Sequence, residues 1–128
     1  KHAINFQTQL EHCRITGDAQ RIEQVVINLL SNAIKYSPEA ERIEVELQAD
    51  KQNVTVAIRD FGFGIEQEHV KHIFTRFYRI DELSPNISGL GIGLYLSHEI
   101  ITRHNGRIWV ESKAGEGSTF YFSLPVLN

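Results

Sequence analysis

The chain has 128 residues, of which 41% are apolar and 23% charged, as is typical of one soluble globular domain. Its net charge of −3 disfavours nucleic acid as a partner, and no apolar run approaches the roughly 20 residues of a membrane-spanning helix. The single cysteine, Cys13, excludes an intramolecular disulfide and is typical of a reducing compartment. We therefore expect one cytoplasmic domain over residues 1–128, and the start at Lys1 suggests that it is excised from a longer protein.

The first part of the chain predicts two short strands followed by a long helix. Alternation with polar residues indicates a strand at Ile4, Phe6, Thr8 and Leu10. A second short strand is predicted over residues 13–16, and Asp18 is a good N-cap for the helix that follows. Spacings of three and four place the apolar face of this helix at Ile22, Val25, Val26, Leu29, Leu30, Ala33 and Ile34. The helix should end before Pro38, because proline disfavours a helical conformation at the preceding residue.

The middle of the chain predicts a hairpin, a short helix and a loop. Residues 43–49 and 54–58 alternate strictly between apolar and polar side chains, which is typical of paired strands with one wet face and one dry face. Residues 66–74 are predicted to form a short helix. The polar stretch 80–88 contains Pro85 and is predicted to be a loop.

The last part predicts a helix over 91–104, stopped by Asn105-Gly106, and two strands over 107–112 and 118–124. The strands alternate, whereas the strands of a doubly wound parallel sheet are covered on both faces and are apolar throughout. We therefore expect an α/β fold: a two-layer sandwich of a mixed, mostly antiparallel sheet with about three helices packed on one face.

Three polar residues form one stripe on the long predicted helix. Asn28, Asn32 and Lys35 are spaced at i, i+4 and i+7, away from the apolar face. An amide oxygen is a suitable ligand for Mg²⁺, and a lysine can meet a phosphate group. A solvated polar face would produce the same stripe, so both interpretations remain open.

A carboxylate and two glycines follow the predicted strand at 54–58. Asp60 can only accept hydrogen bonds when ionised, which suits an amino group such as the exocyclic amine of adenine. Gly62 and Gly64 would let the backbone approach a flat ring closely. An ordinary turn after a strand is the alternative interpretation.

Glycines also open the helix predicted at 91–104. With Gly89, Gly91 and Gly93, backbone N–H groups and the positive end of the helix dipole can face an anion. A dinucleotide fingerprint requires G-x-G-x-x-G directly after a strand, whereas here the spacing is G-x-G-x-G after a loop. Arg76 and Arg79 are either phosphate clamps or ordinary surface charges.

Taken in order, these motifs resemble the catalytic and ATP-binding domain of sensor histidine kinases, a branch of the GHKL superfamily of ATPases and kinases. Residues 28–37 are similar to the N box of that family, 60–65 to its first glycine box and 74–79 to its F box. Residues 89–94 are similar to the second glycine box, and 115–120 to the closing G-x-G-[ST]-x-F segment. The resemblance covers nearly the whole chain, and five motifs in order make it specific.

The resemblance implies a site for ATP and Mg²⁺. Asn32 would be a ligand of Mg²⁺ with Asn28 beside it, and Asp60 would hold the adenine amine with help from Ser118 through water. The side chains implied to face the phosphates are Lys35, Tyr36, Arg76 and Arg79. The other residues implied to line the nucleotide are Gly62, Gly64, Ile65, Gly89, Leu90, Gly91, Ile92, Gly93 and Leu94. Residues 80–88 would form the ATP lid.

The resemblance also suggests the type of reaction. ATP hydrolases of the superfamily carry a glutamate, as general base, where this chain has Asn28. An amide cannot take a proton from water near neutral pH, so the site should pass the γ-phosphoryl group to a supplied nucleophile. Phosphoryl transfer needs mainly positioning and charge neutralisation. The residues implied to act in catalysis are Asn28, Asn32, Lys35 and Arg79.

The family's acceptor histidine lies in a segment like H-E-x-R-x-P. No such segment surrounds any of the six histidines, which are His2, His12, His69, His72, His98 and His104. We therefore expect a two-component protein-histidine kinase domain that acts on a histidine-containing dimerisation domain of its parent. A response regulator would be an indirect partner, without nucleic acid or direct membrane contact, whether the parent protein is soluble or membrane-anchored. A non-catalytic ATP-sensing module and an anti-sigma-type serine kinase remain alternatives.

Overall fold

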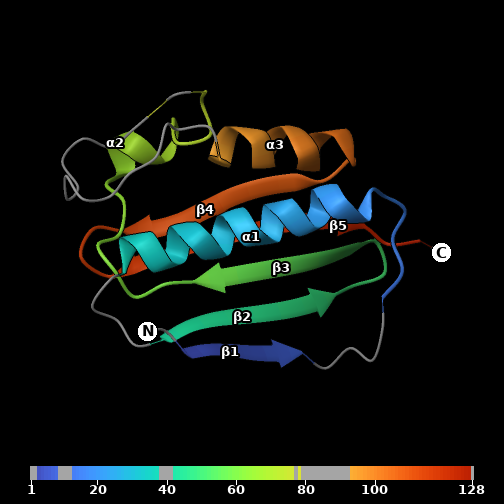
Figure 1. The fold of residues 1–128 in the computed structure, drawn as a ribbon, viewed down its shortest axis with the longest axis horizontal. Coiled ribbons are helices and arrows are strands. Elements are labelled where there is room, and N and C mark those ends of the chain that lie inside the picture. The colour runs from blue at the N-terminus through green and yellow to red at the C-terminus, as the bar shows by residue number, and fades with distance from the viewer. Residues whose placement is uncertain (1–2, 9–12, 38–41, 77, 79–92, 128) are drawn as a thin grey trace.

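The computed structural model describes residues 3–8, 13–37, 42–76, 78 and 93–127 (Figure 1). These residues form a five-stranded sheet with the strand order β1-β2-β3-β5-β4. The strands are β1 Ala3–Thr8, β2 Arg42–Ala49, β3 Asn53–Arg59, β4 Arg107–Lys113 and β5 Gly117–Pro125. β1 pairs with β2 in parallel, and the other three pairs are antiparallel. The predicted mixed, mostly antiparallel sheet is confirmed.

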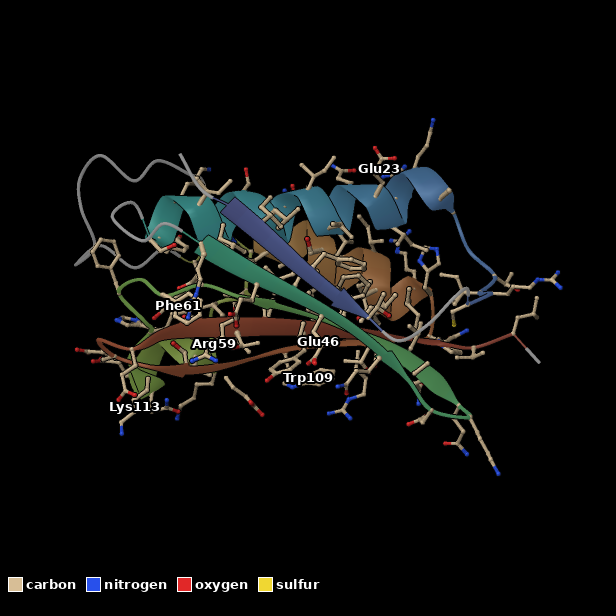
Figure 2. The ribbon with its side chains drawn as sticks, turned by 90° about the horizontal axis from the view of Figure 1, so that it is seen from below. Glu23, Glu46, Arg59, Phe61, Trp109 and Lys113 are labelled. Carbon is tan, nitrogen blue, oxygen red and sulfur yellow. The ribbon has the colours of Figure 1, made fainter. Side chains whose placement is uncertain are left out.

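Three helices accompany the sheet: α1 Ala19–Tyr36, α2 Gln67–Val70 and α3 Gly93–Arg103. The long α1 and α3 lie side by side across the sheet in Figure 1, and the short α2 contacts the end of β4. Figure 2 places Glu23 on the outer side of α1 and Trp109 on the opposite side of the molecule. The two-layer α/β sandwich is thus confirmed. In the part of the chain that the structure describes, no helix is long and apolar enough to cross a membrane.

The core lies between the sheet and the two long helices. On β5, which lies between β3 and β4, Phe120, Phe122 and Leu124 are all at most 3% exposed, as their shared face predicted. Val25 and Leu29 of α1 are fully buried against this layer. The opposite face of the sheet carries polar side chains such as Glu46 and Arg59, as the alternation predicted, and also Trp109, which stacks on Tyr121 (Figure 2).

Helix α1 begins where the sequence predicted. The Asp18 carboxylate accepts hydrogen bonds from the backbone N–H groups of Gln20 and Arg21 at 3.1 and 3.2 Å, which satisfies two donors that have no partner within the helix. At the other end, the Ser37 hydroxyl donates to the Ala33 carbonyl oxygen at 2.7 Å. Both ends are therefore fixed by side chains that lie next to the apolar stripe in the sequence.

Two of the sequence predictions are corrected. Residues 13–16 do not form a strand; the Arg14 carbonyl oxygen accepts one backbone hydrogen bond from Leu127, whereas a strand needs a ladder of them. The helix predicted over 66–74 is only the four-residue α2. It is followed by turns in which Thr75 donates to His72 and Tyr78 to Thr75, so the bonds span three residues instead of four.

Some predicted segments lie outside the described residues. These are the loop at 80–88 and the first two residues of the helix predicted over 91–104. The described part of that helix, α3, ends near the predicted stop, and Asn105 adopts a left-handed backbone with φ of 62°. Asparagine tolerates this conformation better than most residues do.

We predict that Asp18→Ala lowers the free energy of unfolding by about 1 kcal/mol, because two N–H groups at the start of α1 lose their acceptor. Urea denaturation followed by circular dichroism measures this change. Asp18→Asn is the matched control, since an amide oxygen caps a helix about as well as a carboxylate. Equal losses for the two variants would contradict the capping role.

Candidate nucleotide-binding site

The carboxylate of Asp60 is buried just beyond the end of β3, where it is 1% exposed. Its Oδ1 atom accepts hydrogen bonds from the backbone N–H groups of Gly62, at 3.0 Å, and Ser118, at 3.2 Å. No other donor among the described residues reaches the carboxylate, and no salt bridge of that part of the chain includes it. Oδ2 therefore remains available to accept a hydrogen bond.

Burial controls the charge state of this group. It raises the pKa of the Asp60 carboxyl above its ordinary value, and the backbone hydrogen bonds from Gly62 and Ser118 oppose this shift. A buried carboxylate without a cationic partner costs stability. Such a group is a candidate for binding a ligand, and the bond from Gly62 N–H also closes a turn after β3.

The two glycines after Asp60 are required by contacts within the protein. A Cβ atom on Gly62 would lie 1.7 Å from the Tyr36 carbonyl oxygen, at the end of α1. Gly64 has a φ of +72°, and a Cβ atom there would lie 2.1 Å from the Lys113 carbonyl oxygen. The loop at 60–65 is thus packed between α1 and the end of β4. Glycine is therefore required at both positions by packing within the protein, in addition to the predicted approach of the backbone to a flat ring.

Ser112 lies beneath this loop and was not predicted from the sequence. Its Oγ atom accepts a hydrogen bond from Ile65 N–H at 2.7 Å, donates to the Gly117 carbonyl oxygen at 3.0 Å and lies 2.7 Å from the Ser118 hydroxyl. Ser112 and Ser118 are directly paired across β4 and β5. If residues are counted outward from the turn at 114–116, Ser112 and Ser118 are the second pair of the hairpin. This position in the hairpin was the signal in the sequence that could have predicted their contact.

Asn28 on α1 is half-buried against α3. Its Nδ2 atom lies 3.4 Å from the Gly93 carbonyl oxygen and 3.3 Å from the Ser97 hydroxyl. Because a carbonyl oxygen can only accept, the amide nitrogen must face α3, and Oδ1 points away from that helix. At Asn28 the stripe is therefore not only solvated, because its amide also contacts α3. Along the same stripe, Asn32 is half-buried and Lys35 is exposed.

The structure brings some of the predicted site residues into direct contact. Gly62 packs on Tyr36, Ser118 donates to Asp60, and Asn28 meets Gly93. Arg76 is not among these contacts: it is exposed, and its guanidinium lies 5.9 Å from the ring centre of Tyr95. Five predicted site residues lie outside the described residues, namely Arg79, Gly89, Leu90, Gly91 and Ile92.

The described residues contain two other features that could bind a ligand or a metal ion. A groove of about 480 Å³ runs between the first half of α1 and the exposed side of α3, with Arg21, Leu96 and Arg103 among its lining residues. At the start of α2, the side chains of Glu66, the N-cap residue, and of Glu68 and His69 lie close enough to hold a metal ion. The sequence analysis did not foresee this cluster, whose two carboxylates are exposed. Neither feature shares a residue with the predicted site.

Comparison with known proteins identifies the class. Residues 17–128 match the family described as histidine kinase-, DNA gyrase B-, and HSP90-like ATPase. The chain therefore belongs to this ATPase family, which confirms the resemblance found in the sequence.

The similar proteins narrow the comparison to histidine kinases. The chain is 41% identical to the adaptive-response sensory kinase SasA of Thermosynechococcus vestitus over 96% of its own length, but it spans only 35% of that protein. It is 32% identical to the catalytic domain of histidine kinase ThkA, with a TM-score of 0.80, covering 95% of this chain and 78% of that one. A structure of full-length ShkA in complex with AMPPNP has a TM-score of 0.84 at 25% identity, covering 98% of this chain and 26% of that one.

Within the ATPase family, this chain is thus of the type found in the catalytic domains of histidine kinases. The predicted fold class and kinase type are both confirmed by these comparisons. The roles of individual site residues stay predictions.

We predict that Asp60→Asn leaves the unfolding temperature at pH 7 unchanged or raises it by a few degrees. A change of about 1 kcal/mol in the free energy of unfolding shifts this temperature by roughly 4 °C. The amide oxygen can still accept both backbone hydrogen bonds, and the buried charge is removed. Because the pKa is raised in the folded state, ionisation lowers stability as pH rises through the raised pKa. The advantage of the variant should therefore shrink as pH falls through that value.

Asp50→Asn is the matched control for this measurement. Asp50 also accepts two backbone hydrogen bonds, from Gln52 and Asn53, both at 2.7 Å. It is exposed, however, and the bonds from Asn53 and Gln52 lower its pKa. Its neutralisation should therefore lower stability at pH 7, opposite in sign to Asp60→Asn. A loss of stability in both variants would contradict the assignment of Asp60 as a ligand-binding group.

Proposed function

We propose that this chain is the ATP-binding catalytic domain of a two-component sensor histidine kinase. It transfers the γ-phosphoryl group of Mg·ATP to a histidine on a separate dimerisation domain of its parent protein. The observation that carries this proposal is the buried Asp60 carboxylate, one oxygen of which meets no donor among the described residues, in a chain of the histidine kinase-type ATPase family.

The base end of the nucleotide fits the surroundings of Asp60. Oδ2 would accept a hydrogen bond from the exocyclic amine of adenine, and the Ser118 hydroxyl would take part through water. Gly62, Gly64 and Ile65 would lie along the ring. The ATP analogue AMPPNP in the ShkA structure supports a nucleotide in this family of folds.

The phosphate end of the nucleotide fits the polar stripe of α1, which consists of Asn28, Asn32 and Lys35. The α3 contacts of Asn28 leave its Oδ1 atom available, and with Asn32 it offers the neutral oxygen ligands that Mg²⁺ accepts beside phosphate and water. When bound, Mg²⁺ neutralises charge on the phosphates. Lys35, exposed in the last turn of α1, and Tyr36 would face the phosphate groups.

The second glycine box completes the proposed site. Gly93 and Leu94 begin α3, and with the preceding motif they would line the triphosphate through backbone N–H groups. Arg79 and Arg76 would neutralise charge on the phosphates. The proposed members outside the described residues are Gly89, Leu90, Gly91, Ile92 and Arg79, with 80–88 as the ATP lid.

The residues present favour transfer over hydrolysis. Asn28 stands where a general base would be needed to activate water, and an amide cannot accept that proton. A neutral imidazole brings its own nucleophilic nitrogen and needs no such base. The nucleophile would come from the rest of the parent protein, since the chain spans about a third of the length of SasA.

The proposed setting follows from this chemistry. The direct partner is the histidine-containing dimerisation domain, and a response regulator is the indirect one, without nucleic acid or direct membrane contact. We place the domain in the cytoplasm, where ATP is abundant and a free cysteine such as Cys13 stays reduced.

We predict that Asp60→Asn weakens ATP binding by at least about 100-fold, because an amide N–H₂ group would face the adenine amine where an acceptor is needed. Isothermal titration calorimetry measures the affinity. Asp50→Asn is again the control, and should bind ATP like the wild type. Unchanged affinity of the Asp60 variant for ATP would refute the adenine assignment.

We also predict that Asn32→Ala raises the Mg²⁺ concentration needed for half-maximal ATP binding and slows phosphoryl transfer about tenfold or more, because a metal ligand is lost. The assay adds the parent's dimerisation domain and follows acid-labile label, which marks phosphohistidine. Ser31→Ala, at an exposed neighbouring position of α1, is the control. Acid-stable label on serine, or no transfer by the wild type, would refute the proposed kinase activity itself.

A further inference from the structure

The hydroxyl of Ser112 makes three hydrogen-bond contacts at the base end of the proposed site. Ile65 N–H lies 2.7 Å away, the Gly117 carbonyl oxygen 3.0 Å and the Ser118 hydroxyl 2.7 Å. Ser118 in turn donates its backbone N–H to Asp60 Oδ1 at 3.2 Å. Ser112 is therefore one hydrogen bond away from the residues proposed to face adenine.

Counting protons fixes the direction of these bonds. A serine hydroxyl has one proton and two lone pairs. The Gly117 carbonyl can only accept, so it takes the Ser112 proton, and the Ile65 N–H group can only donate, so it takes one lone pair. In the remaining contact, Ser118 must be the donor and Ser112 the acceptor. The hydrogen-bonding capacity of Ser112 is then full.

This order decides what Ser118 can offer a ligand. Its only hydroxyl proton is used by Ser112, so its Oγ atom presents lone pairs alone. Asp60 presents only lone pairs as well, because an ionised carboxylate has no proton to give. Both side chains proposed to bind the base, Asp60 directly and Ser118 through water, are therefore acceptors.

We propose that Ser112 is a positioning residue that sets base specificity. By holding the Ser118 proton, it keeps the base end of the site free of side-chain donors from Asp60 and Ser118. The site then accepts a purine with an amino group at position 6 and rejects one with an oxo group there. This inference rests on the proposed ATP-binding function and deepens it.

The surroundings hold Ser112 in place. It is directly paired with Ser118 across the β4–β5 hairpin. Its carbonyl oxygen accepts a hydrogen bond from Gln67 Nε2, on α2, at 2.8 Å. Gly117 lies so close to the Asp60 backbone that a Cβ atom would be 2.3 Å from the Asp60 carbonyl oxygen. Such a supported arrangement can keep a proton orientation in the absence of ligand.

The test compares ATP with inosine triphosphate, which differs at position 6 by an oxo group in place of the amine. Calorimetry gives the ratio of the two dissociation constants for this chain. In Ser112→Ala the Ser118 hydroxyl loses its acceptor, so it can rotate and donate its proton toward the ligand or the water that bridges to it. We expect the preference for ATP over inosine triphosphate to fall about fivefold or more, the size of one hydrogen bond.

Three further variants make the result specific. Ser112→Thr keeps the hydroxyl and should restore the wild-type ratio within about twofold. Ser123→Ala removes another buried serine of β5 and should leave the ratio unchanged. Ser118→Ala removes the acceptor, so ATP binding should weaken about fivefold while inosine triphosphate binding does not weaken.

The outcomes separate a specificity role from a structural one. If Ser112→Ala weakens both nucleotides equally, Ser112 only supports the loop and the inference is overturned. If that variant does not fold, Ser118→Ala decides, and equal weakening of both nucleotides overturns the inference. Failure of the wild type to bind ATP, or unchanged ATP binding by Asp60→Asn, refutes the proposed function instead.

Discussion

A buried carboxylate held by two backbone N–H groups is the interaction on which this site depends. The bond from Gly62 requires the tight loop that packs on the end of α1, and the bond from Ser118 requires β5 beside β3. Burial raises the pKa of Asp60, so the fold maintains this charge at a cost in stability. A protein retains such a cost at functional sites, where a ligand that binds the charge offsets it.

Helix α1 connects the two ends of the proposed site. At its C-terminal end, the Tyr36 carbonyl contacts the loop that holds Asp60, and two turns earlier Asn28 is oriented by Gly93 and Ser97 of α3. The buried stripe of α1 fixes both positions on the sheet. The proposed base site and the proposed metal site would thereby be held at a constant distance by one helix, which is the kind of preorganisation that phosphoryl transfer requires.

Much of the fold could be predicted from local patterns. Alternation along 43–49 and 54–58 predicted the hairpin, and the apolar stripe with its N-cap predicted α1, because these signals depend only on neighbours in the sequence. The predicted strand at 13–16 was wrong, since a strand exists only when another segment pairs with it. The helix predicted at 66–74 was too long, because three-residue turns replace helical bonds after Val70.

The sequence by itself determined the family, the fold class and the residue types of the proposed site, because these are carried by the order and spacing of motifs such as 28–37 and 60–65. Only the tertiary structure decided which way the Asn28 amide faces, why Gly62 admits no side chain, and which groups surround the Ser112 hydroxyl. The first two result from contact between segments far apart in the chain, and the third adds the distant Ile65 N–H group to a pair within one hairpin. Hydrogen-bond direction depends on every partner around an atom, and no local pattern records those partners.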